Sequence, residues 1–364
     1  MHDLTSDTKS WSSSPGLTSV EQLTPGGLRL LLDEAAPFLS QLSALPTSVD
    51  ALPQPQTDTR GSDVNNTQIL SVISYYANPY ADQSILRAFD HPALREIAGG
   101  CSGSLYVDAS AKGGGNTSAK KGETIADTLS CMECYSDVCV LRHSDPIAVE
   151  EAVARSKKKL ILAGGGGAQD VAGAFGDLIS IIEALKEKGR HIGDGGRPIS
   201  LILCGNLADG NAPASELVVL LSKITPKPAL AEGSTVLIVR CVTRAGFVGL
   251  SFQARAHVDE CASIELVEVP VQSPGEGQGK GGAIDDTELA AAIGEGDVIY
   301  VCGEEGQIMI GGETGLKKMA GAIILAADGD DVGIEGRANA NCFWAKQSNC
   351  RLAARMAIFR LLLA

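Results

Sequence analysis

Short apolar runs alternate along this chain with longer segments whose apolar residues recur at helical spacing. Strands that alternate with helices predict parallel sheets, because each crossover helix returns the chain to the same end of the sheet. We therefore expect an α/β protein with two doubly wound parallel-sheet domains. Strands are expected at 69–76, 138–142, 160–163, 199–204, 235–240, 263–269, 298–302 and 323–326, and helices at 125–134, 148–154, 174–188, 215–223, 254–261, 286–292 and 351–363.

Length and composition agree with this class. The 364 residues suffice for two medium domains, and 44% apolar content with only 4% aromatic residues suits an α/β core. A net charge of −14 argues against a nucleic-acid partner, and no apolar run reaches the length of a membrane span. The first residues lack a recognisable signal or transit peptide, so we expect a soluble intracellular protein of unknown compartment with its ten cysteines mostly reduced.

Shifts in composition predict the domain bounds. Residues 1–16 are expected to be a disordered tail. The first domain is expected at 17–180 plus 340–364, with a Pro-rich loop at 44–66, and the second at 190–336, with a Gly-rich loop at 273–282. A helix is expected to begin at Pro25 with Thr24 as its N-cap.

Two local motifs suggest a metal, redox or nucleotide site. The pair Cys131-Met-Glu-Cys134, with Cys139 nearby, has no second pair or His partner to complete a zinc site, so we predict small buried side chains instead. The glycine run 164–167 permits close backbone approach, but no Lys-Ser/Thr follows it as a P-loop requires. We predict no cofactor and no metal.

Residues 116–128, Asn-Thr-Ser-Ala-Lys-Lys-Gly-Glu-Thr-Ile-Ala-Asp-Thr, closely resemble the mobile loop and following helix of aspartate carbamoyltransferases. Further stretches are similar to the same aspartate/ornithine carbamoyltransferase family. They are Val140-Leu-Arg-His143, Gly176-Asp-Leu178, Trp344-Ala-Lys-Gln347 and Ala354-Arg-Met-Ala357. The resemblance implies the carbamoyltransferase fold from about residue 18 to 364, with the C-terminal helix returning to the N-terminal domain. It also implies a trimer in which the loop enters the neighbouring subunit's active site, and a reaction of carbamoyl phosphate with aspartate in pyrimidine biosynthesis.

The chain departs from the family where the ligands should bind. Carbamoyl phosphate and aspartate need several arginines, a histidine and backbone amides. By alignment, the family's Ser-Thr-Arg-Thr-Arg becomes 79–83, its His-Pro-Thr-Gln becomes 170–173, and an Arg becomes Asn211. Its Arg-x-Gln becomes 303–305, and its His-Pro-Leu-Pro-Arg becomes 326–330.

The replacements predict an acidic cleft in place of a cationic one. Its members are Asp82, Asp170, Glu305, Asp328 and Asp330. Matching positions of the phosphate and carbonyl site keep only Ser118, Lys121 and Arg142, while His143 is interpreted as a structural polar group.

Removing one preorganised oxyanion donor typically costs about 10²–10³ in rate, so several such losses predict an inactive homologue. We interpret the chain as a pseudoenzyme with no catalytic residues, acting as a trimer-forming scaffold or as a subunit of a larger complex. The trimer could be homo- or heteromeric; in a mixed trimer, the 116–128 loop could complete a competent neighbour's site. Alternatively, Lys120–Thr128 persists because Glu123 starts an interfacial helix in which Ala126 and Leu129 pack.

Two other functions stay open. The chain could be an active aspartate carbamoyltransferase whose motifs are misaligned. It could also be a sensor that binds Mg²⁺, Ca²⁺ or an amine in the acidic cleft, since hard cations prefer carboxylate oxygens.

Overall fold

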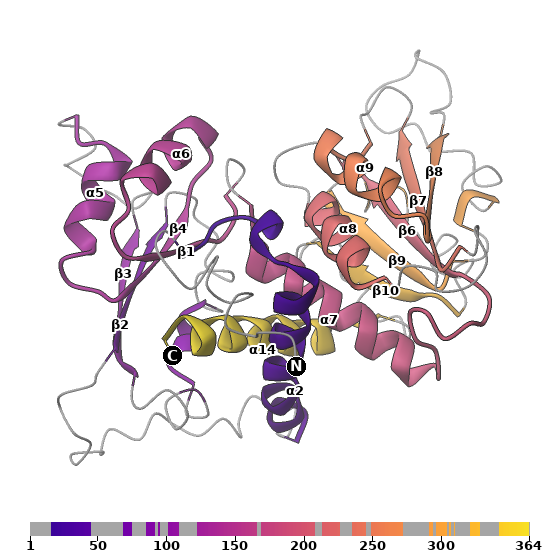
Figure 1. Cartoon of the computed structure of the whole chain (residues 1–364), viewed down its shortest axis with the longest axis horizontal. Helices are drawn as coiled ribbons and strands as arrows, with labels where there is room; N and C mark the ends of the chain where they lie inside the picture. Colours follow the sequence, from indigo (N-terminus) through magenta and orange to yellow (C-terminus); the bar gives the residue numbers. More distant parts are fainter. Residues whose placement is uncertain are drawn as a thin grey trace. The chain divides into compact units, whose positions relative to one another are not determined.

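The computed structural model divides the chain into two compact units. Unit 1 comprises Met1–Gly176 and Asn349–Ala364, and unit 2 comprises Asp177–Ser348. The chain leaves unit 1 within helix α7 (Val171–Glu187) and returns within α14 (Trp344–Leu363; Figure 1). The structure describes residues 16–44, 68–74, 85–91, 94, 101–108, 122–165, 169–207, 213–225, 235–244, 249–271, 291–293, 296–303, 306, 309, 321–327 and 342–363.

Unit 1 contains a five-stranded sheet in which all neighbouring strands are parallel. The strand order is β1 (Gly16–Leu17), β5 (Lys159–Leu162), β4 (Val138–Arg142), β2 (Gln68–Ser74) and β3 (Cys101–Asp108). Alternate residues of β4 serve opposite faces of this sheet, as strand geometry requires. Cys139 and Leu141 pack in a core cluster with helical residues 129, 149 and 152, whereas Val140 faces the side where Ile358 and Phe359 of α14 lie.

The helices of unit 1 begin where the sequence supplies caps. The Thr24 hydroxyl accepts from Gly27 N (2.9 Å) at the start of α2 (Pro25–Ala44). Thr124 and Asp127 form a capping box at the start of α5 (Ile125–Met132). Asp145 caps α6 (Pro146–Arg155), which packs beside α5, and the short 3₁₀ helix η1 (Val20–Gln22) starts at Ser19.

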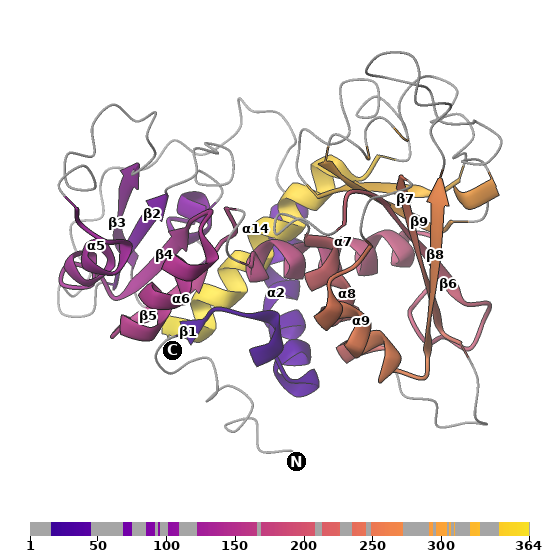
Figure 2. The same cartoon turned by 90° about the horizontal axis from the view of Figure 1, so that it is seen from above.

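Unit 2 contains a second five-stranded parallel sheet. Its order is β10 (Ile323–Ala326), β9 (Val298–Cys302), β6 (Ile199–Gly205), β7 (Leu237–Arg244) and β8 (Ile264–Val271). Helices α8 (Pro213–Ile224) and α9 (Phe252–Asp259) pack against each other in this unit (Figure 2). The central strands β9 and β6 are buried along their whole length, as expected for parallel sheets, whereas β7 alternates in part between buried and half-buried residues.

The predicted α/β class with two parallel sheets is confirmed, and so is the return of the C-terminal helix to the N-terminal part. The Phe359 ring meets Phe89 edge to face with centroids 5.3 Å apart, and Arg360 pairs with Glu34 at 2.7 Å. Two strands, β1 and β3, were not expected from the sequence. Among the described residues, no helix combines the length and apolar character needed to cross a bilayer.

Candidate functional site

The carboxyl ends of β2 and β4 lie side by side in unit 1. Ser74 at the end of β2 is in register with Arg142 at the end of β4, and both are buried. In open parallel sheets, ligands bind just beyond such carboxyl ends. This edge is therefore where the structure offers a candidate site.

Arg142 is the one residue of the three predicted site remnants that the structure describes. Its side chain is 4% exposed, and Nη1 donates to the carbonyl oxygen of Ala163 at 2.8 Å. The guanidinium therefore lies against the end of the neighbouring strand β5, and one of its donors is used within the protein.

His143 follows directly and lies against the turn after β5. Its backbone N donates to Gly164 O (3.2 Å), and its Nδ1 accepts from Asp145 N (2.9 Å). Burial lowers the pKa of the imidazole below its usual 6.5, which favours the neutral ring. Both contacts agree with the predicted structural role.

The turn after β5 reaches His143 because it contains glycine. Gly165 has φ +110°, and a Cβ there would lie 2.7 Å from His143 N. The predicted close backbone approach at the glycine run is thus present at Gly165.

Asp170 stands at the N-terminus of α7. Its Oδ1 accepts from Gly173 N at 2.8 Å, and its carbonyl accepts from Ala174 N at 2.9 Å. Gly173 leaves room for this cap, since a Cβ there would come within 2.7 Å of the carboxylate. A helix N-terminus otherwise attracts anions through its free N–H groups and its dipole. Here a carboxylate of the chain itself takes that place.

The remaining predicted site residues lie outside the described part of the chain. These are Ser118 and Lys121 of the loop and Asp82, Glu305, Asp328 and Asp330 of the predicted acidic cleft. The cleft as a whole therefore stays a prediction. Within the described ranges, no group of three His, Cys, Asp or Glu side chains is arranged to hold a metal.

A buried hydrogen-bond network in unit 2 was not predicted. Tyr300 Oη donates to Asp177 Oδ2 at 2.5 Å, and Gln347 Nε2 donates to Asp177 Oδ1 at 2.8 Å and to Ala326 O at 2.6 Å. Ala326 N donates in turn to Gln347 Oε1 at 3.2 Å. Asp177 and Gln347 belong to two stretches that resemble carbamoyltransferases, so the network joins two parts of that resemblance.

A carboxylate inside an apolar helix was the signal that could have revealed this network. Asp177 is fully buried in α7, and Tyr300 and Gln347 are buried as well. Buried polar groups need partners, so such a residue predicts donors from neighbouring elements. The sequence alone does not say which elements supply them.

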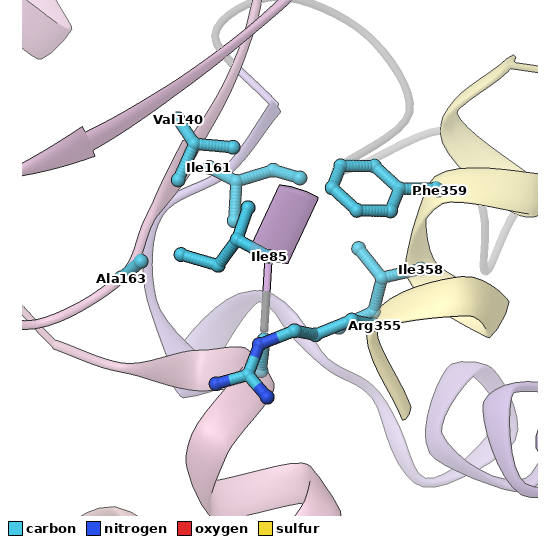
Figure 3. Close-up of a pocket in the computed structure, with 8 residues that line it drawn as sticks. Ile85, Val140, Ile161, Ala163, Arg355, Ile358 and Phe359 are labelled. Carbon is cyan, nitrogen blue, oxygen red and sulfur yellow. The ribbon is translucent and has the colours of Figure 1, made fainter. Parts of the chain in front are cut away.

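Figure 3 shows an apolar cavity in unit 1. Its walls include Val140, Ile161 and Phe359, and the guanidinium of Arg355 points away from the Phe359 ring. An anion needs donors and positive charge, whereas the remaining lining residues Ile85, Ala163, Ala172 and Ile358 are apolar. We interpret it as a packing gap between the sheet and α14.

The prediction for the cysteine pair was wrong. Cys131 and Cys134 are both exposed, and only Cys139 is buried. Cys131 lies in the last turn of α5 and Cys134 lies just beyond its end, and neither shares the buried positions of Ala126 and Leu129.

Comparisons with known proteins agree with the resemblance in the sequence. The chain is 44% identical over 69 residues to multifunctional protein CAD of Squalus acanthias and 40% identical over 109 residues to a chloroplastic aspartate carbamoyltransferase of Oryza sativa subsp. japonica. These stretches cover 19% and 29% of this chain but only 3% and 27% of the relatives. No family model matches the chain.

Solved structures extend the likeness to the whole fold. Aspartate transcarbamoylase from Trypanosoma cruzi in complex with carbamoyl phosphate and aspartate superposes with a TM-score of 0.67 at 19% identity, covering 98% of this chain and 99% of that one. A putative aspartate carbamoyltransferase from Leishmania major Friedlin gives 0.62 at 16% identity, covering 97% and 96%. The predicted resemblance to aspartate carbamoyltransferases and the predicted carbamoyltransferase fold are thereby confirmed.

Proposed function

We propose that this chain, which has the aspartate carbamoyltransferase fold, has lost carbamoyl transfer and acts as a trimer-forming scaffold or as a subunit of a larger complex. The observation that carries the proposal is the position of Asp170. Its carboxylate caps α7 at the carboxyl edge of the first sheet, where an anionic substrate would need free N–H groups.

The Asp170 carboxylate would repel a phosphate bound at this edge. Two unit charges about 4 Å apart repel by about 4 kcal/mol at an effective dielectric constant of about 20, and a phosphate dianion doubles that repulsion. Arg142 opposes the effect with one positive charge, but one of its donors already binds Ala163 O. The balance at the described edge is unfavourable for a dianion.

The sequence supports the same conclusion at positions beyond the described residues. The stretches 79–83, 209–212 and 326–330 contain no arginine, lysine or histidine, although the resemblance calls for them. Donors aimed at developing negative charge supply much of the acceleration in acyl transfer. Their combined loss predicts turnover close to the uncatalysed rate.

The scaffold role rests on what the chain retains. The segment 116–128 keeps the sequence of a loop and helix that serve a neighbouring subunit in the family it resembles. The described end of this segment forms a capped helix, α5, through Thr124 and Asp127. A retained assembly surface together with a lost ligand site favours a structural subunit.

Two measurements on the full chain test the proposal. Formation of carbamoylaspartate from labelled carbamoyl phosphate and aspartate should stay at the blank rate, and sedimentation should give a trimer or larger complex. Turnover at ordinary enzymatic rates would establish the active-enzyme alternative. A lone monomer that copurifies with nothing would remove the scaffold role.

Substitution and titration separate the alternatives further. Asp330→Arg should remain inactive, because restoring transfer needs more than one cation. Calorimetry with Mg²⁺, Ca²⁺ and spermidine tests the sensor alternative. A binding heat that saturates with added ligand would support it, and a flat titration would exclude it.

A further inference from the structure

Cys131 and Cys134 form the two ends of one turn at the end of α5. Cys134 N donates to Cys131 O at 3.1 Å where α5 ends, and both side chains are exposed. In a turn closed by this hydrogen bond the side chains at positions i and i+3 eclipse one another.

The backbone spacing of this turn suits a disulfide. Helix geometry with a rise of about 1.5 Å per residue places the Cα atoms of residues i and i+3 about 5 Å apart. Disulfides join Cα atoms that are roughly 4.4–6.8 Å apart. The two thiols can therefore meet by side-chain rotation and small adjustment at a helix end.

Three buried cysteines offer a contrast within the same chain. Cys139 is buried five residues further on, and burial raises the pKa of its thiol to about 11. Burial likewise raises the pKa of Cys204 and Cys241 to about 12. Because the thiolate is the reactive species, a pKa raised from 9.0 to about 11 leaves about a hundredfold less of it at neutral pH.

We propose that Cys131 and Cys134 form a reversible dithiol–disulfide site that exchanges with low-molecular-weight disulfides such as glutathione disulfide. One cysteine thiolate attacks glutathione disulfide, forms a mixed disulfide and releases one glutathione. The second cysteine attacks the protein sulfur of that mixed disulfide and releases the second glutathione. Two protein thiols are oxidised, one glutathione disulfide is reduced to two glutathiones, and the two thiol protons pass to the glutathiones.

Closure of this disulfide should leave the core of unit 1 unchanged. The buried residues of α5 are Ala126 and Leu129, and Leu129 belongs to the apolar cluster beneath the helix. Cys131 and Cys134 lie outside that cluster. The modified chain should therefore keep its fold and assembly.

The test uses the full native chain equilibrated with defined ratios of reduced and oxidised glutathione. Free thiols are then alkylated, and the chain is digested with trypsin without reduction. Cleavage after Lys121 and Arg142 releases peptide 122–142, which contains Cys131, Cys134 and Cys139. The alkylating agent is kept in the digest, so that Cys139 reacts once the fold is lost. We expect the oxidised peptide to have lost two hydrogens and to carry one alkyl group, on Cys139.

Single substitutions separate ring closure from simple modification. Cys131→Ser and Cys134→Ser should each abolish the internal disulfide and accumulate a glutathione adduct on the remaining thiol. Cys342→Ser, which removes a partly exposed cysteine elsewhere, should leave the titration of peptide 122–142 unchanged. The proposal is overturned if both thiols stay free at every ratio, or if only glutathione adducts form in the unsubstituted chain.

Discussion

Asp177 in helix α7 and Asp170 at the N-terminus of that helix differ in burial and in the groups that donate hydrogen bonds to them. Asp177 is fully buried within α7 and accepts hydrogen bonds from Tyr300 and Gln347. Asp170, seven residues earlier, stands at the end of the helix and accepts from the backbone of Gly173. One carboxylate joins helices and strands within unit 2, and the other accepts from the first turn of its own helix.

One aspartate lies in a stretch that resembles the family, and the other lies in a stretch that does not. Asp177 and its partner Gln347 lie in stretches that resemble aspartate carbamoyltransferases, and a hydrogen bond between them joins α7 to α14. Asp170 lies where the resemblance fails, and its carboxylate accepts from the backbone N–H of Gly173 in the first turn of α7. The chain thus combines the carbamoyltransferase fold with a helix N-terminus that is capped by its own carboxylate.

Asp177→Ala should have the largest effect. It leaves the buried Tyr300 hydroxyl without the acceptor at 2.5 Å and removes one acceptor of Gln347, so we expect a loss of about 2–5 kcal/mol in the free energy of unfolding. Urea denaturation followed by circular dichroism measures the loss. Tyr300→Phe, which removes only one donor, should cost less. Surface substitutions usually change the free energy of unfolding by no more than about 0.5 kcal/mol. A change that small in Asp177→Ala would contradict the structural role.

Gly165→Ala tests the packing of the turn after β5 against the backbone of His143. Its positive φ and the contact with the His143 backbone predict a loss of about 2–3 kcal/mol. Gly189→Ala is the matched control: this glycine has φ +67° but open space around it, so only about 1 kcal/mol should be lost. The difference between the two unfolding free energies isolates the steric term. Equal losses in unfolding free energy would show that the turn at Gly165 adjusts to a Cβ without a steric cost.

Asp170→Ala should cost about 1 kcal/mol, because it removes a helix cap. Asp170→Asn keeps the cap but removes the charge, so stability should stay near that of wild type. If the carboxylate repels phosphate, the Asn variant should bind inorganic phosphate more tightly, on the order of tenfold. Calorimetry with phosphate measures this change. Unchanged affinity would mean that Asp170 does not govern the charge of this edge.

The smallest effect concerns pH at the start of α5. The hydrogen bond from the Thr124 hydroxyl, followed by that from its backbone N–H, lowers the pKa of Asp127 below 3.8. A lowered carboxyl pKa stabilises the fold above the unfolded-state value, and this contribution is lost as pH falls through the folded-state pKa. NMR titration of Asp127 should show the lowered value, and Thr124→Ala should move it back towards 3.8. An unchanged titration in Thr124→Ala would exclude the capping box as the cause.

Buried strands were predictable to the residue where apolar runs have sharp ends. The expected spans 138–142, 298–302 and 323–326 match β4, β9 and β10. Strand β3 was missed because it lies at the edge of its sheet, where Leu105 and Tyr106 are exposed and no alternation with a buried face marks the strand. Strand β1 has only two residues, too few for any pattern.

Helix starts and site contacts were harder to predict. Helix α14 begins at Trp344, whereas the sequence predicted a start at 351. The prediction missed the first two turns because they carry the polar residues Lys346, Gln347 and Ser348 and lack an apolar stripe. The sequence named Arg142 and Asp170 but could not indicate that one binds Ala163 O and the other caps α7. Such contacts depend on how strands and turns meet, which no local pattern encodes.

The path of the chain through its two units has a practical consequence for dissecting the molecule. Unit 1 is assembled from segments at both ends of the sequence, and Phe359 and Arg360 contact Phe89 and Glu34 within it. A truncated fragment ending at Gly176 would expose the aromatic surface of Phe89 and leave Glu34 without its cation. An isolated N-terminal unit should therefore be produced as a fusion that splices residues 349–364 onto Gly176 through a short linker.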